Sequence, residues 1–163
     1  QGGRIKELTN ILDIHATILD LAKVKNTSHC DGRSVLPLVN KTSKKWENEI
    51  FIQISESQLA RSLRTEKWKY CITDQASNGS DKPSSNQYME TNLYDLDADP
   101  YELNNLIGIS TYDEIVTSLR KKIKSKIKKV ENITTKITKA KNVNNPGQMG
   151  LNPDSFHRLK KKL

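Results

Sequence analysis

The 163-residue sequence is poor in the residues on which several classes of protein depend. Its two cysteines, Cys30 and Cys71, are too few for a disulfide framework or a cysteine-based metal site, and we expect both to be free thiols. Its seven glycines lack the spacing of a phosphate-binding loop. No apolar run approaches the roughly 18–20 residues that span a bilayer, so we predict no membrane segment. The apolar fraction of 34% is low for a globular chain, so part of the chain is not expected to be packed core.

Charge is distributed unevenly along the chain. Residues 1–119 contain 13 Lys/Arg and 17 Asp/Glu, whereas residues 120–163 contain 14 Lys/Arg and 2 Asp/Glu. The formal net charge of +8 therefore originates in the last quarter of the chain. It describes a C-terminal segment rather than the folded body.

The first regular element that the pattern predicts is a helix. Asn10 and Asp13 are spaced as a capping box, so the helix should begin near Ile11. Its expected buried face consists of Leu8, Ile11, Leu12, His15, Ile18, Leu19 and Ala22, which recur at helical spacing. We therefore expect His15 to have a core role rather than a ligand role.

Strands follow this helix. The ranges 50–55, 59–64, 68–73 and 92–96 favour strands, and the middle two read as an antiparallel hairpin. The Ser/Asn-rich residues 75–87 predict a loop between strands.

A second helix should follow near residue 112, with Thr111 and Glu114 as a capping box, and continue to Val130. The fold class is therefore α+β: a small antiparallel sheet of three to four strands packed with an N-terminal and a C-terminal helix. We divide the chain into a subdomain over residues 1–130 and a Lys/Asn-rich extension over residues 131–163.

No convergent set of catalytic or metal-binding residues emerges from the sequence. A calcium loop starting at Asp95 would need Gly and Glu where the chain has Pro100 and Leu106. The histidines His29 and His157 lie apart from any clustered carboxylates or nucleophile. We therefore predict neither a catalytic nor a metal-ligating residue in this chain.

The basic stretch 120–129 has the positive charge that a polyanion site requires. Its lysines are Lys121, Lys122, Lys124, Lys126, Lys128 and Lys129. Base recognition and stacking require arginine forks and aromatic rings, but the stretch has one arginine and no aromatic residue. We therefore expect no nucleic-acid partner and interpret the lysines as a solvated helix face. An autonomous polyanion-binding module is the alternative.

Four segments together resemble the C-terminal region of sulfatases of the arylsulfatase and choline-sulfatase type, in the alkaline phosphatase superfamily. Residues 10–22 resemble "S-x-x-D-x-x-P-T-x-x-D-x-A-G", and residues 31–38 resemble "DG-x-S-L-x-P-L". Residues 61–70 resemble "R-x-x-R-T-x-x-W-K-Y", and residues 92–106 resemble "x-L-Y-D-L-x-x-D-P-x-E-x-x-N-L". The order and spacing of these segments make the resemblance specific over residues 8–106. Ala16 and Lys23 depart from it, where Pro and Gly are usual.

The resemblance implies that the reactive groups lie upstream of this segment. Sulfatases form a formylglycine from the Cys or Ser of a C/S-x-P-x-R motif, and neither Cys30 nor Cys71 begins such a motif. Calcium is the metal expected for the parent enzyme, and no cofactor is expected in this chain. The main partner is therefore an upstream sulfatase catalytic domain. Self-association through a surface made for that domain is a further expectation.

The resemblance also suggests residues near the mouth of the substrate pocket. The loop after the first strand would reach it with Gln53, Ser55, Glu56 and Gln58. A polar rim suits a sulfated small molecule or glycan, although an ordinary exposed strand end explains the same residues. The family includes secreted, periplasmic, lysosomal and cytoplasmic proteins, so the compartment stays open.

We therefore predict the C-terminal part of an enzyme that hydrolyses sulfate esters, inactive by itself, with a structural and pocket-trimming role. A related phosphodiesterase or phosphonate hydrolase is the alternative within the same superfamily.

Overall fold

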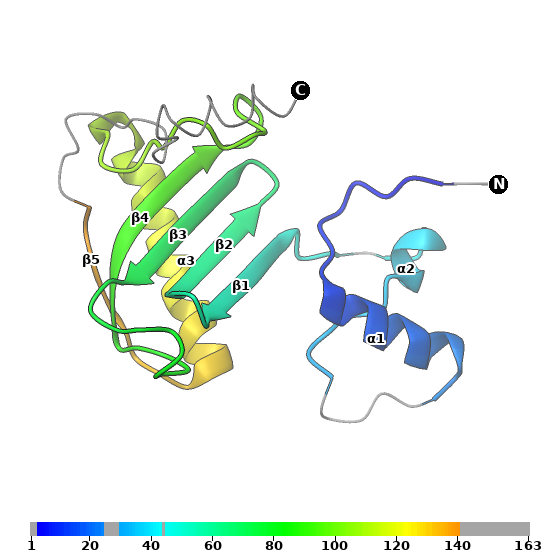
Figure 1. Ribbon diagram of the computed structural model, residues 1–163. Coiled ribbons are helices and arrows are strands. Elements are labelled where there is room, and N and C mark those ends of the chain that lie inside the picture. The colour runs from blue at the N-terminus through cyan, green and yellow to red at the C-terminus, as the bar shows by residue number, and fades with distance from the viewer. Residues whose placement is uncertain (1–2, 25–29, 44, 141–163) are drawn as a thin grey trace, which may run out of the picture. The chain divides into compact units, whose positions relative to one another are not determined.

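The computed structural model describes residues 3–24, 30–43 and 45–140. The chain divides into two compact units, Gln1–Ile50 and Phe51–Leu163. The first unit contains the helices α1 (Ile11–Leu21) and α2 (Leu36–Val39). The second contains most of a sheet and the long helix α3 (Asp113–Glu131), as Figure 1 shows.

Helix α1 begins where the sequence predicts, because its capping box is complete. The Asn10 side chain accepts from the backbone N–H of Leu12 at 2.8 Å, and the Asp13 carboxylate accepts from the N–H of Asn10 at 2.9 Å. These bonds satisfy donors that a helix N-terminus leaves without partners. The helix ends just before Lys23, which adopts the left-handed conformation with φ 55°.

The buried face of α1 differs from the predicted one. Asp13 and Ala16 are buried, whereas His15 and the apolar residues of the opposite side are exposed. The exposed apolar stripe consists of Ile11, Ile14, Ile18 and Leu21. The expected core role of His15 was therefore wrong; its Nδ1 lies 3.6 Å from the Cys30 sulfur at the surface.

The reason is that polar side chains of α1 bind the segment that follows the helix. The Asp13 carboxylate accepts from the backbone N–H of Arg33 at 2.8 Å, and the Thr17 hydroxyl accepts from that of Val35 at 3.0 Å. Gly32 packs so closely that an added Cβ would lie 2.0 Å from the Leu12 carbonyl oxygen. The aspartate, threonine and glycine of the family-like segments therefore form one structural contact.

The sheet has five strands in the order β1-β2-β3-β4-β5. Their bounds are Glu49–Ser55, Leu59–Thr65, Trp68–Asp74, Gln87–Asp95 and Lys136–Thr138. The α+β class and the hairpin of β2 and β3 are confirmed, and β3 and β4 also pair antiparallel. Strand β4 starts earlier than predicted, and β5, which pairs parallel with β4, was not predicted.

Helix α3 covers one face of this sheet (Figure 1). The apolar core between them contains Leu59, Leu63, Tyr70, Ile72, Tyr88, Leu93, Val116, Leu119, Ile123 and Ile127. Tyr112 contacts the half-buried Trp68 edge to face, with ring centroids 5.9 Å apart. The predicted Thr111–Glu114 capping box does not form, because a 3-10 turn, Ser110–Tyr112, leads into the helix.

Strand β4 contains an irregularity in its pairing with β3, and the loop after β4 provides hydrogen bonds to the backbone at that point. The register with β3 shifts between Cys71 and Ile72, which leaves Thr91 without a paired residue. The Asn105 amide donates to the carbonyl oxygen of Thr91 at 2.8 Å and accepts from the N–H of Leu93 at 2.9 Å. One side chain therefore replaces the missing strand partner.

The sheet includes residues that the sequence assigned to the C-terminal extension. Ile137 of β5 is buried in the core, and the backbone N–H of Ala140 donates to the Glu90 carboxylate at 3.1 Å. Residues 141–163 lie outside the described part of the chain.

Candidate functional site

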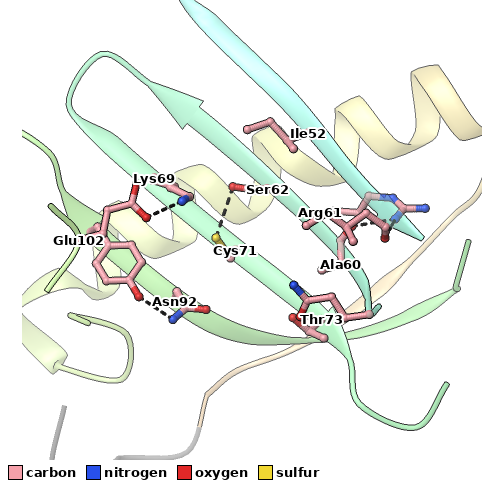
Figure 2. A pocket seen from close by; sticks show the side chains of 12 residues that line it. Ile52, Ala60, Arg61, Ser62, Lys69, Cys71, Thr73, Asn92 and Glu102 are labelled. Carbon is pink, nitrogen blue, oxygen red and sulfur yellow. Dashed lines mark hydrogen bonds and ion pairs between the residues drawn. The ribbon is translucent and has the colours of Figure 1, made fainter. Parts of the chain in front are cut away.

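The face of the sheet opposite α3 contains a hollow of about 280 Å³, which Figure 2 shows from close by. Side chains alternate between the two faces of a strand, so the neighbours of core residues line this face. The hollow is lined in part by Ile52, Gln58, Ser62, Lys69, Asn92 and Glu102. Aliphatic groups from β1 and polar groups from β2 to β4 therefore face the same space.

The charged groups of the hollow neutralise each other. Lys69 forms an ion pair with Glu102, which stands in the loop after β4. Glu102 has φ 58°, a left-handed conformation that is uncommon for residues other than glycine. Beside it, the Asn92 amide donates to the Tyr94 hydroxyl at 2.9 Å. The hollow therefore offers hydrogen-bonding groups and no net charge from this pair.

The thiol in the hollow is not activated for nucleophilic attack. Cys71 donates to the Ser62 hydroxyl at 3.3 Å (Figure 2), and burial raises the pKa of the Cys71 thiol. Burial also raises the pKa of the Tyr94 hydroxyl. Because a reactive cysteine needs a lowered pKa, the thiol here is suited to packing rather than to chemistry.

Within residues 3–24, 30–43 and 45–140, no group of three or more His, Cys, Asp or Glu side chains could hold a metal ion. The run of aspartates after β4 builds a turn: Asp95 accepts from the backbone N–H of Asp97 at 3.2 Å and forms an ion pair with Lys67 at 3.4 Å. His29 and His157 lie outside the described residues.

The four predicted rim residues separate into different environments. The Gln53 amide donates to the Glu131 carboxylate at 2.9 Å, and the Ser55 hydroxyl donates to the Pro83 carbonyl at 2.7 Å. Gln58 lines the hollow on the other face of the sheet. Glu56 is exposed and lies with Gln58 in the turn 56–58, which joins β1 to β2. Their binding of a substrate stays a prediction, and Gln58 is the member that reaches the hollow.

Loop 75–86 supports this turn closely. A Cβ added at the buried Gly79 would lie 2.5 Å from the Gln58 carbonyl oxygen and 2.6 Å from the Glu56 nitrogen. Only a residue without a side chain fits there, so loop and turn are packed backbone against backbone.

Arg61 binds the segments on either side of the turn between β1 and β2. It was not identified as a site residue from the sequence. Its side chain is fully buried and binds Glu131 through two nitrogens, at 2.6 and 3.2 Å. It also donates to the carbonyl oxygens of Ile54 at 3.0 Å and Pro83 at 2.7 Å. An arginine at a core-facing strand position was the available signal, because such a charge requires a partner.

A second buried charge cluster surrounds Glu90. Its carboxylate accepts from the Tyr70 hydroxyl at 2.8 Å and from Arg120 of α3 at 2.6 Å. Burial, followed by the nearby Glu90 charge, raises the pKa of Tyr70, so this hydroxyl stays protonated and remains a donor. The cluster connects strands β3 and β4 to the helix.

Comparison with known proteins assigns the chain to a family. Residues 1–129 match the family model described as N-sulphoglucosamine sulphohydrolase, C-terminal. Arylsulfatase K of Gallus gallus is 30% identical over 132 residues, which cover 75% of this chain and 22% of that protein. An ulvan-active sulfatase of Formosa agariphila is 27% identical over 143 residues, 74% of this chain and 29% of that protein. The chain thus spans less than a third of these curated relatives.

Solved structures share the fold. A complex of a protein with its substrate D-glucosamine-2-N,6-O-disulfate aligns with a TM-score of 0.60 and 22% identity, over 74% of this chain and 24% of that one. A putative sulfatase of Bacteroides thetaiotaomicron aligns with a TM-score of 0.56 and 19% identity, over 80% and 30% of the two chains. These structures show the fold, and the family-model match over residues 1–129 shows that the chain belongs to the sulfatase family and represents its C-terminal region.

Proposed function

We propose that this chain is the C-terminal subdomain of an enzyme that hydrolyses sulfate esters. The observation that carries the proposal is the match of residues 1–129 to a family model of a sulphohydrolase C-terminal region. The matched part corresponds to less than a third of each curated relative, so the reactive centre is proposed to belong to a separate catalytic domain. The subdomain docks on that domain and completes the substrate pocket.

Two apolar surfaces support the docking step, one in each compact unit. The first is the exposed stripe of α1, where Ile11 is 80% exposed and Leu21 is 64% exposed. The second is the sheet face opposite α3, where Ile52 and Ile54 are both more than a third exposed. Aliphatic groups gathered on a surface favour burial against a partner, at roughly 25 cal/mol for each Å² removed from water.

The formylglycine and the calcium ion expected of the parent enzyme do not fit the described residues. Neither cysteine is followed by the Pro and Arg that formylglycine formation requires, and the described side chains form no metal-binding group. The proposal therefore assigns both groups to the catalytic domain and routes no chemical step through this chain.

The contribution of the chain to the substrate pocket is a polar rim. Gln58 lines the hollow, and a glutamine amide can donate to the oxygens of a sulfate or a sugar hydroxyl. Gln53 and Ser55 hold the end of β1 through Glu131 and Pro83, and thereby position the turn that contains Gln58. One of the similar structures contains D-glucosamine-2-N,6-O-disulfate, which supports a sulfated sugar as the substrate class.

The test is sulfate release by the full-length protein that contains this chain. We expect turnover of D-glucosamine-2-N,6-O-disulfate, and none from the isolated 163-residue chain on that sugar or on an aryl sulfate. The variant Gln58→Ala should raise KM about three- to tenfold with little change in kcat, as the loss of one neutral hydrogen bond predicts. Gln87→Ala, at an exposed position at the start of β4, is the matched control.

Two results contradict the proposal. Faster hydrolysis of a phosphodiester or a phosphonate ester than of any sulfate ester would assign the protein to the alternative enzyme class. Turnover of a sulfate ester by the pure isolated chain would place the reactive centre in this chain.

A further inference from the structure

The exposed side of α3 presents a row of lysines. Lys121, Lys124, Lys128 and Lys129 are all exposed. A helix turns by about 100° and rises about 1.5 Å per residue, so the first three lie within roughly 60° of one another and about 4.5 and 6 Å apart along the axis. This row is on the side of α3 away from the buried Leu119, Ile123 and Ile127.

Few acidic side chains lie beside the row: Asp113 and Glu114 share a surface hollow with Lys121 at its N-terminal end. Between residues 120 and 140 the chain has nine Lys/Arg and one acidic residue, Glu131. The Glu131 carboxylate is engaged by the buried Arg61, and Arg120 is the member of the basic set that binds Glu90. The remaining charge of this segment is therefore almost entirely lysine.

Stability of the helix does not require this arrangement. The helix macrodipole favours cations only in the last turn, which explains Lys128 and Lys129 but not Lys121 and Lys124. A solvated helix gains from glutamates placed three or four residues from its lysines, whereas α3 has no acidic residue between Glu114 and Glu131. Like charges at that spacing repel one another, so the row costs stability unless an anion binds it.

We infer that the lysine row of α3, defined by Lys121, Lys124, Lys128 and Lys129, is a docking site for a sulfated polysaccharide. The ammonium groups of Lys121, Lys124 and Lys128 repeat along one line, and Lys129 extends the charge to one side of the last turn. This spacing matches the repeated sulfates of such a chain, and binding would release the counterions of both. The choice of a sulfated ligand rests on the proposed function. A nucleic acid fits less well, because the row contains neither an arginine fork nor an aromatic ring for base contacts.

The test uses the whole 163-residue chain and a fluorescently labelled heparin oligosaccharide, with binding followed by anisotropy. In the test variant, Lys121, Lys124, Lys128 and Lys129 are replaced together by glutamine, which preserves helix propensity. In the control variant the exposed lysines Lys6, Lys41, Lys45 and Lys82 are replaced by glutamine, which removes the same charge elsewhere.

We expect the test variant to weaken heparin binding by about tenfold or more at moderate salt, and to reduce the slope of log Kd against log salt by roughly 3. The control variant should change Kd by less than about twofold. Far-UV circular dichroism and thermal melting establish that α3 is intact in both variants. Desulfated heparin should bind the unmodified chain at least about tenfold more weakly than heparin.

Equal effects of the two variants would overturn the inference, because net charge rather than the row would then account for binding. Tighter binding of a single-stranded oligothymidylate than of heparin at matched charge would also overturn it, in favour of nucleic acid. These measurements need no turnover. A failure of the sulfatase assay therefore leaves them interpretable, and a failure of heparin binding leaves the sulfatase proposal standing.

Discussion

At the residue scale, the amide of Asn105 takes the place of a strand residue. A strand that gains one extra residue leaves backbone groups without partners, and buried groups of this kind are costly. The Asn105 amide nitrogen donates to the Thr91 carbonyl, and its oxygen accepts from the backbone N–H groups of Leu93 and Ile107. No other residue type of similar size offers both in this geometry.

Substitution of Asn105 should therefore destabilise the second unit. We expect Asn105→Ala to lower the free energy of unfolding by about 1–3 kcal/mol, because three backbone groups, on Thr91, Leu93 and Ile107, lose this partner. Asn105→Asp should also destabilise, since a carboxylate accepts from Leu93 but cannot donate to Thr91. Urea unfolding followed by fluorescence measures the change.

The neighbouring Asn104→Ala serves as the control, because Asn104 is exposed and its backbone N–H provides the hydrogen bond to Asp99. If Asn104→Ala and Asn105→Ala lowered stability equally, the assigned role of Asn105 would be wrong.

The sequence predicted a structural role for residues 92–106 but not the contacts that these residues make. The family-like pattern over residues 92–106 includes Asn105, yet its partner depends on a register shift inside β4. Register is set by pairing with β3 and by the core face, which local composition does not reveal. The same limit applies to Glu102, whose left-handed backbone brings its carboxylate to Lys69.

At the scale of elements, Arg61 joins three segments that are distant in sequence. It binds Glu131 at the end of α3, the Pro83 carbonyl in loop 75–86 and the Ile54 carbonyl in β1. A fully buried guanidinium is tolerated only when its donors are paired, so these elements depend on one another. The turn that contains Gln58 is thereby fixed at its base.

Removal of the Arg61 side chain should strongly destabilise the second unit. We expect Arg61→Ala to lower the free energy of unfolding by about 3–5 kcal/mol, because it leaves Glu131 buried without its partner. The double variant Arg61→Met/Glu131→Gln should cost less than the sum of its single variants, since the second change removes the charge left unpaired by the first. Urea unfolding reported by Trp68 fluorescence tests both statements.

Arg64→Met, at a half-buried position three residues along the same strand, is the matched control and should cost less than about 1 kcal/mol. If the double variant lowered the free energy of unfolding by the sum of the two single effects, the assigned coupling between Arg61 and Glu131 would be wrong.

The sequence predicted the helices and strands that nearby residues specify. It did not predict the strand that forms only through pairing with a distant part of the chain. The spacing of apolar residues located α1, α3 and the β2–β3 hairpin, because each is specified by nearby residues. Strand β5 has a single apolar residue, Ile137, and pairs with β4 across about fifty residues, so no local signal marks it. The pattern of α1 predicted a buried face that includes Ile11 and Ile18, whereas these residues belong to the exposed stripe and the buried side is formed by Asp13 and Ala16.

At the scale of the whole molecule, the chain combines a buried core in the second unit with apolar surface that the described residues leave exposed. The stripe of α1 is the clearest case, since Ile11, Ile14, Ile18 and Leu21 are each more than half exposed. Contiguous apolar surface of this kind is typical of interaction sites. Under the proposed function, the catalytic domain is its normal partner.

In the isolated chain that partner is absent, so the stripe should drive self-association. We expect the mass measured by light scattering after size exclusion to rise with concentration, and the double variant Ile14→Lys/Ile18→Lys to remain monomeric, because a lysine pair interrupts the stripe with charge. Gln75→Lys/Ala76→Lys adds the same two charges at exposed positions of the second unit and should leave association unchanged. If both double variants abolished association equally, net charge and not the α1 stripe would be responsible. Full-length protein should not self-associate through α1, because there the same isoleucines are proposed to be buried against the catalytic domain. In that protein their replacement by lysine should instead lower thermal stability.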